Sequence, residues 1–100
     1  MELLNHAPAS DTVRLSRFKV EVALLGPKDH ANLDFTTPTK FLPTTIAVYF
    51  NGARLKRGVG EDYVVSESGG PGSGYDTITL LDPALAPYST EKLFADYIQA

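Results

Sequence analysis

The dipeptide Asn51-Gly52, within the stretch from Ile46 to Val65, is the feature that most restricts how this chain can fold. A two-residue hairpin turn of type I′ requires a positive φ at both central residues, which Asn tolerates and Gly adopts freely. With this turn, the expected cross-strand partners are Phe50 with Ala53, Tyr49 with Arg54, Val48 with Leu55 and Ala47 with Lys56. The pairing collects apolar side chains on one face: Ile46, Val48, Phe50, Ala53 and Leu55. Turn chemistry and side-chain alternation select the same register, and we therefore predict a β-hairpin here.

The residues from Val13 to Leu25 alternate in polarity, with a shift of phase that predicts a bulge or bend near Ser16. After this shift the expected buried residues are Phe18, Val20, Val22 and Leu24, with Lys19 and Glu21 facing water between them. The connection from Lys28 to Thr45 carries a short predicted strand at about 33–37. Its prolines, Pro38 and Pro43, restrict any pairing to sheet edges.

The second half of the chain continues with short strands and turns. A Gly-rich turn at 57–60 leads to a strand at about 62–67, and another strand covers 76–81. Between them, the sequence SGGPGSG at 68–74 predicts a flexible loop. The segment from Glu91 to Ile98 fits both a helical stripe and an alternating strand, so its pattern leaves two interpretations open.

Short strands separated by turn signals predict an all-β fold, either a single antiparallel β-sandwich or a small barrel. The 100 residues, 43% of them hydrophobic and 21% charged, are typical of one soluble domain. We place this domain at residues 12–100. Residues 1–11 contain Pro8 and no periodicity, so we interpret them as an N-terminal arm in which Leu3 and Leu4 are a possible interface.

Composition argues against several functions. The chain has no cysteine, which excludes disulfides and thiolate zinc sites. A net charge of -3 argues against general nucleic-acid binding, which requires a basic surface. No window reaches the ~18 apolar residues of a membrane span, and the N-terminus lacks the basic leader and apolar run of a signal peptide. We therefore expect neither a nucleic-acid nor a membrane partner.

Residues that could carry chemistry are few. Asp29, His30 and Asp34 fall in the loop after the first predicted strand, but one His without Cys provides too few ligands for a closed metal site. The favoured interpretation is a solvated loop histidine with capping aspartates. The Gly-rich loop lacks the Lys-Ser/Thr ending of a phosphate loop, and no G-x-S-x-G elbow is present. We predict no catalytic residue, no metal and no cofactor.

Possible interface residues lie near the hairpin. Arg54, Lys56 and Arg57 form a small basic patch that could bind an acidic partner or phosphate, or simply be solvated. Tyr49 shares a face with Arg54, and an exposed aromatic there would be a candidate interface residue. The alternative is that a second sheet covers Tyr49 inside the sandwich. The residues expected to form structural turns are Asn51, Gly52, Gly60, Asp62 and Tyr63.

Six short motifs follow one another between Asn32 and Ile98. They are N-x-x-F-T-T-P at 32–38 with a further Pro after it, V-Y-F-N-G-A-R-L at 48–55, a Gly turn that runs from Gly58 or Gly60 to Asp62-Tyr63, T-I-T-L at 77–80, A-P at 86–87 and A-D-Y at 95–97. In order and spacing the series resembles a small β module of tailed-bacteriophage tail, fibre and capsid-surface proteins. Two features depart from that module: Glu61 lengthens the turn, and the 68–74 loop is longer. The resemblance implies that 91–98 is a strand, and it carries no catalytic residues.

The resemblance also implies a function: a non-enzymatic virion structural protein, as a capsid decoration or head spike, or as a neck or tail component. Its partners would be other virion proteins, and it would be a homo-oligomer or occur in multiple copies within a symmetric assembly. Its location would be the virion, assembled in the host cytoplasm. The alternative is a carbohydrate- or host-surface-binding module, because exposed tyrosines such as Tyr75 and Tyr88 beside Ser/Gly loops suit shallow polar ligands.

Overall fold

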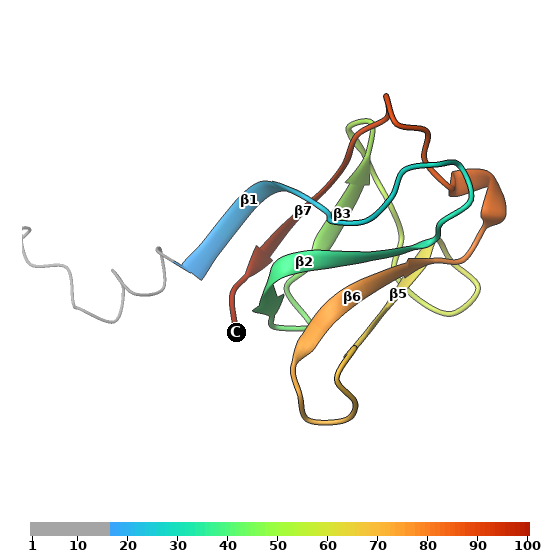
Figure 1. Ribbon diagram of the computed structural model, residues 1–100. Helices are drawn as coiled ribbons and strands as arrows, with labels where there is room; N and C mark the ends of the chain where they lie inside the picture. The colour runs from blue at the N-terminus through green and yellow to red at the C-terminus, as the bar shows by residue number, and fades with distance from the viewer. Residues whose placement is uncertain (1–16) are drawn as a thin grey trace, which may run out of the picture.

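The computed structural model describes residues 17–100, which form a β-sandwich of two antiparallel sheets (Figure 1). The strands are β1 (Phe18–Ala23), β2 (Asp34–Phe41), β3 (Ala47–Phe50), β4 (Ala53–Arg54), β5 (Tyr63–Ser66), β6 (Tyr75–Leu80) and β7 (Leu93–Ile98), with a 3-10 helix, η2 (Pro83–Leu85). One sheet has the order β1-β7-β3-β4 and the other β2-β6-β5. The predicted all-β sandwich is confirmed. The proposed arm at 1–11, with Leu3 and Leu4, and the predicted bend near Ser16 lie outside the described residues.

The β3–β4 hairpin has the predicted turn and register. Its paired residues are Tyr49 with Arg54 and Phe50 with Ala53, and the Leu55 N–H donates to the Val48 carbonyl at 2.8 Å. Asn51 and Gly52 have φ values of 49° and 88°. The Asn51 side chain also accepts a 2.8 Å hydrogen bond from the Lys92 N–H, at the start of β7. The same dipeptide therefore turns the hairpin and fixes it to the neighbouring strand.

The segment that fitted both a helix and a strand is β7, the central strand that pairs with β1 and β3. Its Leu93, Ala95 and Tyr97 are buried, and the alternate residues are half-buried. The buried side chains of both sheets form one core: Leu24, Phe35, Phe41, Ile46, Val48, Tyr63, Ile78, Leu80, Leu93, Ala95 and Tyr97. The Tyr97 hydroxyl lies 2.9 Å from the Thr39 hydroxyl of β2, so a hydrogen bond also joins the two sheets. Among the described residues, no helix has the length and apolar character that a membrane crossing requires.

The predicted burial of β1 is wrong at its beginning. Phe18 and Val20 are 53% and 57% exposed, whereas Leu24 is buried as predicted. The register between β1 and β7 shifts between Lys19 and Val22, and Glu21 has a φ of 50°. An irregularity of this kind reverses the face to which the preceding side chains point. Within the described residues, the alternation of buried and exposed side chains in β1 therefore changes phase at Val20 and Glu21.

β2 is longer than predicted because it continues through Pro38. It is an edge strand whose only ladder partner in the second sheet is β6. Its register shifts between Thr36 and Phe41, around the proline. An edge position tolerates a residue without an N–H; the outer side of β2 makes isolated bridges at Thr36 and Phe41, with Leu25 and Gln99, but not at Pro38. The prediction that proline confines this segment to an edge is therefore confirmed, although its length was underestimated.

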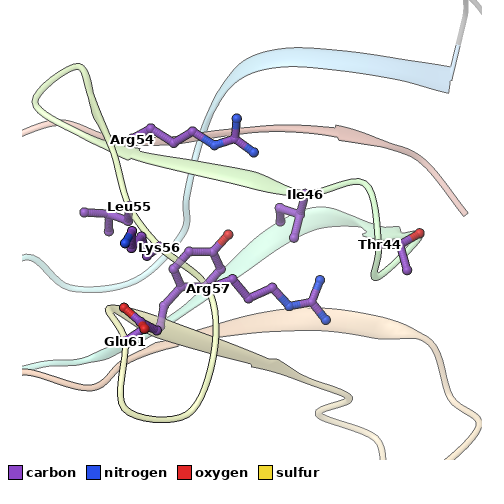
Figure 2. A pocket seen from close by; sticks show the side chains of 8 residues that line it. Thr44, Ile46, Arg54, Leu55, Lys56, Arg57 and Glu61 are labelled. Carbon is purple, nitrogen blue, oxygen red and sulfur yellow. The ribbon is translucent and has the colours of Figure 1, made fainter.

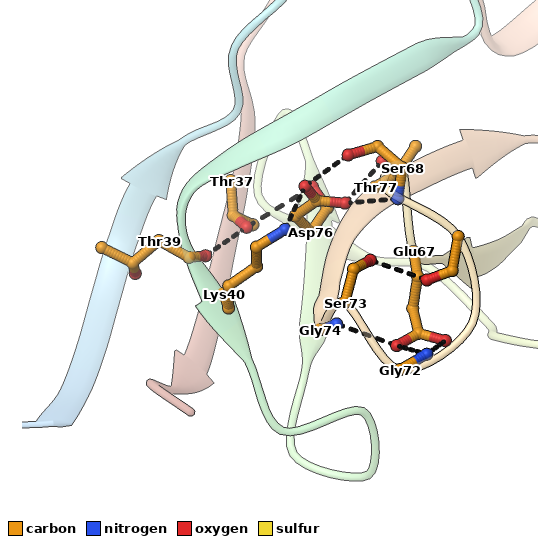
Figure 3. A network of polar contacts seen from close by, with 11 residues as sticks. Thr37, Thr39, Lys40, Glu67, Ser68, Gly72, Ser73, Gly74, Asp76 and Thr77 are labelled. Atoms are coloured by element: carbon orange, nitrogen blue, oxygen red, sulfur yellow. Dashed lines mark hydrogen bonds and ion pairs between the residues drawn. The ribbon is translucent and has the colours of Figure 1, made fainter.

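Two carboxylates bridge the Gly-rich loop at 68–74, which the sequence predicts to be flexible. Glu67 accepts hydrogen bonds from the N–H groups of Gly72 and Gly74, and Asp76 accepts them from both the N–H and the hydroxyl of Ser68 (Figure 3). The Lys40 ammonium lies 2.9 Å from Asp76. Burial tends to raise the pKa of Asp76, but these donors together with the Thr77 hydroxyl outweigh it and hold the pKa well below its usual range.

Candidate functional site

Arg54, Lys56 and Arg57, three of the predicted interface residues, line one open pocket of about 750 Å³. The other lining residues are Thr44, Ile46, Leu55, Glu61 and Tyr63. The pocket lies beside the segment 55–62, which connects β4, at the end of one sheet, to β5, at the end of the other. Figure 2 shows Arg57 extending from this segment toward Thr44, with Glu61 on the opposite side. The pocket is therefore an edge of the sandwich.

Of the predicted turn residues, Gly60 and Asp62 lie in the connection that forms the wall of this pocket, whereas Tyr63 is the first residue of β5 and lies in the core. The Asp62 carboxylate accepts a 2.7 Å hydrogen bond from the Lys56 N–H, and the Lys56 carbonyl accepts one from the Asp62 N–H at 2.8 Å. Gly60 has a φ of 82°, which favours glycine. Only the backbone of Lys56 takes part in these two bonds, and the residue is exposed, so its ammonium is at the surface.

The charge of the pocket is positive. Three cations face one carboxylate, Glu61, so the lining carries a formal charge of +2. Among residues 17–100 none of the three cations is in an ion pair, although the Arg57 guanidinium donates a hydrogen bond to the Pro43 carbonyl. Cations without a carboxylate partner remain available to bind an anionic group, and arginine matches carboxylate and phosphate with a planar fork of donors.

Apolar and aromatic groups form the bottom of the pocket. Ile46 and Tyr63 are buried, and Leu55 is half-buried. Burial raises the pKa of Tyr63, and the nearby Arg57 and Arg54 partly oppose that effect. The pocket thus offers positive charge around an apolar centre, which suits a protein surface that carries both carboxylates and apolar side chains.

Tyr49 does not join this pocket. It is half-buried on the outer face of its sheet, so the alternative that the second sheet covers it is wrong. There it lines a separate groove of about 250 Å³ with Glu21, Gly52, Phe94 and Asp96. The predicted interface set is therefore divided between two places, and only its basic members lie together.

The three residues considered as metal ligands, Asp29, His30 and Asp34, each hydrogen-bond to a different part of the protein. Asp29 accepts hydrogen bonds from the N–H groups of Asn32 and Ala31, which lower its pKa. Asp34 accepts from the Thr79 hydroxyl, and His30 Nδ1 lies 2.7 Å from the Ala86 carbonyl. Within residues 17–100 there is no group of three His, Cys, Asp or Glu side chains that could hold a metal ion.

The sequence interpretation missed two surface features. The His30 ring stacks on Tyr88, with ring centroids 3.8 Å apart, and Tyr88 is 53% exposed. Beside the basic pocket lies a hollow lined by Val59, Gly60, Glu61, Asp62, Leu81 and Asp82. Its acidic residues come from segments about 20 positions apart, which the Leu81 N–H to Asp62 carbonyl bond of 3.0 Å brings together. No local pattern in the sequence indicates that proximity.

Comparison with known proteins gives no relative: no family model, no curated protein and no solved structure matches this chain.

Proposed function

We propose that this protein is a non-enzymatic structural component of a tailed-bacteriophage particle, an accessory protein of the capsid surface, neck or tail that acts by protein–protein binding. The observation that carries the proposal is the ordered series of six motifs between Asn32 and Ile98. In the fold these motifs supply framework positions: Asn51 and Gly52 turn a hairpin, Asp62 fixes the segment 55–62, and Tyr97 lies in the core.

The open basic pocket supports a binding role, because an anchor needs unpaired groups at an accessible edge. A particle repeats each site many times, so a contact that is weak on its own gains strength through multivalency. A small sandwich that presents such a pocket fits an accessory position on a repeating surface.

The test is to delete the gene from the phage that encodes it. We expect purified virions to lose this protein as judged by mass spectrometry, and cryo-electron microscopy to show density missing at symmetry-related positions. Complementation with the wild-type gene should restore both. Virions with unchanged composition and unchanged density after deletion would contradict the proposal.

The stacked His30–Tyr88 pair favours a second candidate, a carbohydrate- or host-surface-binding module, because an exposed aromatic ring can stack on a sugar. Tyr75, the other tyrosine considered for that role, is half-buried and packs near Phe41 with ring centroids 6.3 Å apart, so it serves the core. Glycan-array binding by the wild type that is lost in Tyr88→Ala and retained in Tyr88→Phe would support this candidate. No binding to any glycan would count against it.

A further inference from the structure

The basic pocket has an acidic hollow of about 560 Å³ directly beside it. Three acidic residues line that hollow, Glu61, Asp62 and Asp82; the carboxylates of Asp62 and Asp82 each also accept a backbone N–H, from Lys56 and Ala84. Two apolar residues complete it: Leu81 is 39% exposed, and Val59 is 93% exposed between two glycines. A valine this exposed contributes nothing to the core, whereas covering it with another apolar surface would be favourable.

Glu61 lines both the basic pocket and the acidic hollow, so the two are adjacent on one edge of the sandwich. We call this edge the bipolar surface. Its basic half comprises Arg54, Lys56 and Arg57, and its acidic half comprises Glu61, Asp62 and Asp82. Each half combines charge of one sign with apolar groups: Ile46, Leu55 and Tyr63 in the basic half, Val59 and Leu81 in the acidic half.

A surface with adjacent halves of opposite charge is complementary to itself. A two-fold axis places the same patch of two copies face to face, so that the first half of each copy meets the second half of the other. Here the cations of one copy would face the carboxylates of its partner, twice over, with Val59 of each copy directed to the apolar centre of the other's basic pocket. We propose that the bipolar surface binds a second copy of this chain in a two-fold symmetric dimer.

Charge complementarity favours a second copy over a polyanion such as a nucleic acid. The carboxylates of the acidic half repel phosphates at the border of the basic pocket. A second copy supplies both the carboxylates that the basic half lacks and the cations that the acidic half lacks. The dimer is a property of the purified chain and is independent of any role in a phage particle.

The experiment is sedimentation velocity of the full chain over a dilution series. We expect the wild type to convert from monomer to dimer as concentration rises, without larger species. Raising the salt from about 0.1 M to about 1 M shortens the Debye length from ~10 Å to ~3 Å and should shift the equilibrium toward monomer. A wild type that stays monomeric throughout the series would overturn the proposal.

Charge reversal tests the pairing of the two halves. Lys56→Glu and Glu61→Lys should each weaken the dimer by about tenfold or more, because each replaces an attraction by a repulsion at both equivalent contacts. An equimolar mixture of the two variants should restore dimers. In a mixed dimer the two reversed charges face each other and attract, and the unchanged Glu61 of one copy faces the unchanged Lys56 of the other. Loss without restoration in the mixture would overturn the two-fold arrangement.

Two controls keep the result interpretable. Lys92→Glu makes the same change of net charge at an exposed lysine outside both halves, and its dimerisation should match that of the wild type. Arg54→Glu provides a second reversal within the basic half, should Lys56→Glu disturb the turn held by Asp62. The thermal midpoint of every variant is measured to show that it is folded. Equal weakening by Lys92→Glu would contradict a specific surface.

Discussion

At the scale of the residue, Gly52 has a backbone conformation that is unfavourable for any residue with a side chain. Its φ is 88°, and a Cβ at this position would meet no atom within 4 Å, so a substitution acts through the backbone alone. We expect Gly52→Val to cost about 1–3 kcal/mol of the ~5–15 kcal/mol that stabilises a small domain. The melting temperature should fall by several degrees.

Gly52→Asn is the matched comparison, because Asn tolerates a positive φ far better than a β-branched residue. Its melting temperature should lie close to that of the wild type. A valine at Gly72, in the 68–74 loop, would be strained in the same way, since the φ of Gly72 is 86°. Equal melting temperatures for Gly52→Val and Gly52→Asn would show that the turn conformation does not limit stability.

Asp76 gives the fold a pH dependence of known sign. Its pKa is held below the usual value in the folded state, so its contribution to stability is present above the unfolded pKa of about 3.9 and is lost as the pH falls further. Asp76→Asn should lower the unfolding free energy by about 1–3 kcal/mol near neutral pH, because charged hydrogen bonds are lost.

Denaturant titrations of both proteins at several pH values test this expectation. The difference between wild type and Asp76→Asn should be constant near neutral pH and should shrink below about pH 4, where the wild-type carboxylate of the unfolded chain takes up its proton. A difference that stays unchanged down to strongly acidic pH would show that the cost of Asp76→Asn comes from packing instead of charge.

At the scale of the element, the hairpin could be predicted because two local signals agree. Asn51 and Gly52 specify the turn, and the alternation around them specifies the register. The position of the bulge in β1 could not be predicted from the sequence. Its bulge depends on the register against β7, which begins some 70 residues later, and on the Asp96 carboxylate that accepts the Glu21 N–H at 2.8 Å. Alternation alone cannot show where such a distant partner shifts the phase.

The hydrogen bond between Thr39 of β2 and Tyr97 of β7 should contribute to the free energy of unfolding. Tyr97→Phe keeps the buried ring and removes the hydroxyl, which should cost about 1 kcal/mol. A double-mutant cycle combines Tyr97→Phe with Thr39→Val. Thr39→Val should cost less free energy of unfolding in the Tyr97→Phe background than in the wild type, because the Tyr97 hydroxyl that it binds is already absent. Chemical denaturation of the four proteins gives the coupling energy. A coupling near zero would contradict a contribution from this bond.

At the scale of the whole molecule, the candidate site was predictable only in part. The cations are close together in sequence, so Arg54, Lys56 and Arg57 could be recognised as a patch on the hairpin. The acidic half depends on the pairing of β5 with β6, which brings Asp82 near Asp62. Long-range pairing of this kind determines which charges become neighbours, and composition carries no information about it. The surface as a whole therefore required the fold.

The strand order also determines when the protein can fold during synthesis. β7 is the last strand along the chain and yet pairs with β1 and β3, and β6 likewise lies between the earlier strands β2 and β5. On the ribosome, β1 lacks its ladder partner until residues 93–98 emerge, and the apolar faces of the earlier strands stay exposed. Stalled nascent chains that end before Leu93 should be digested readily by protease, whereas chains with Ile98 outside the exit tunnel should resist it. The four-stranded sheet can therefore close only after residues 93–98 have emerged, whereas every strand of the three-stranded sheet has been made once β6 ends at Leu80.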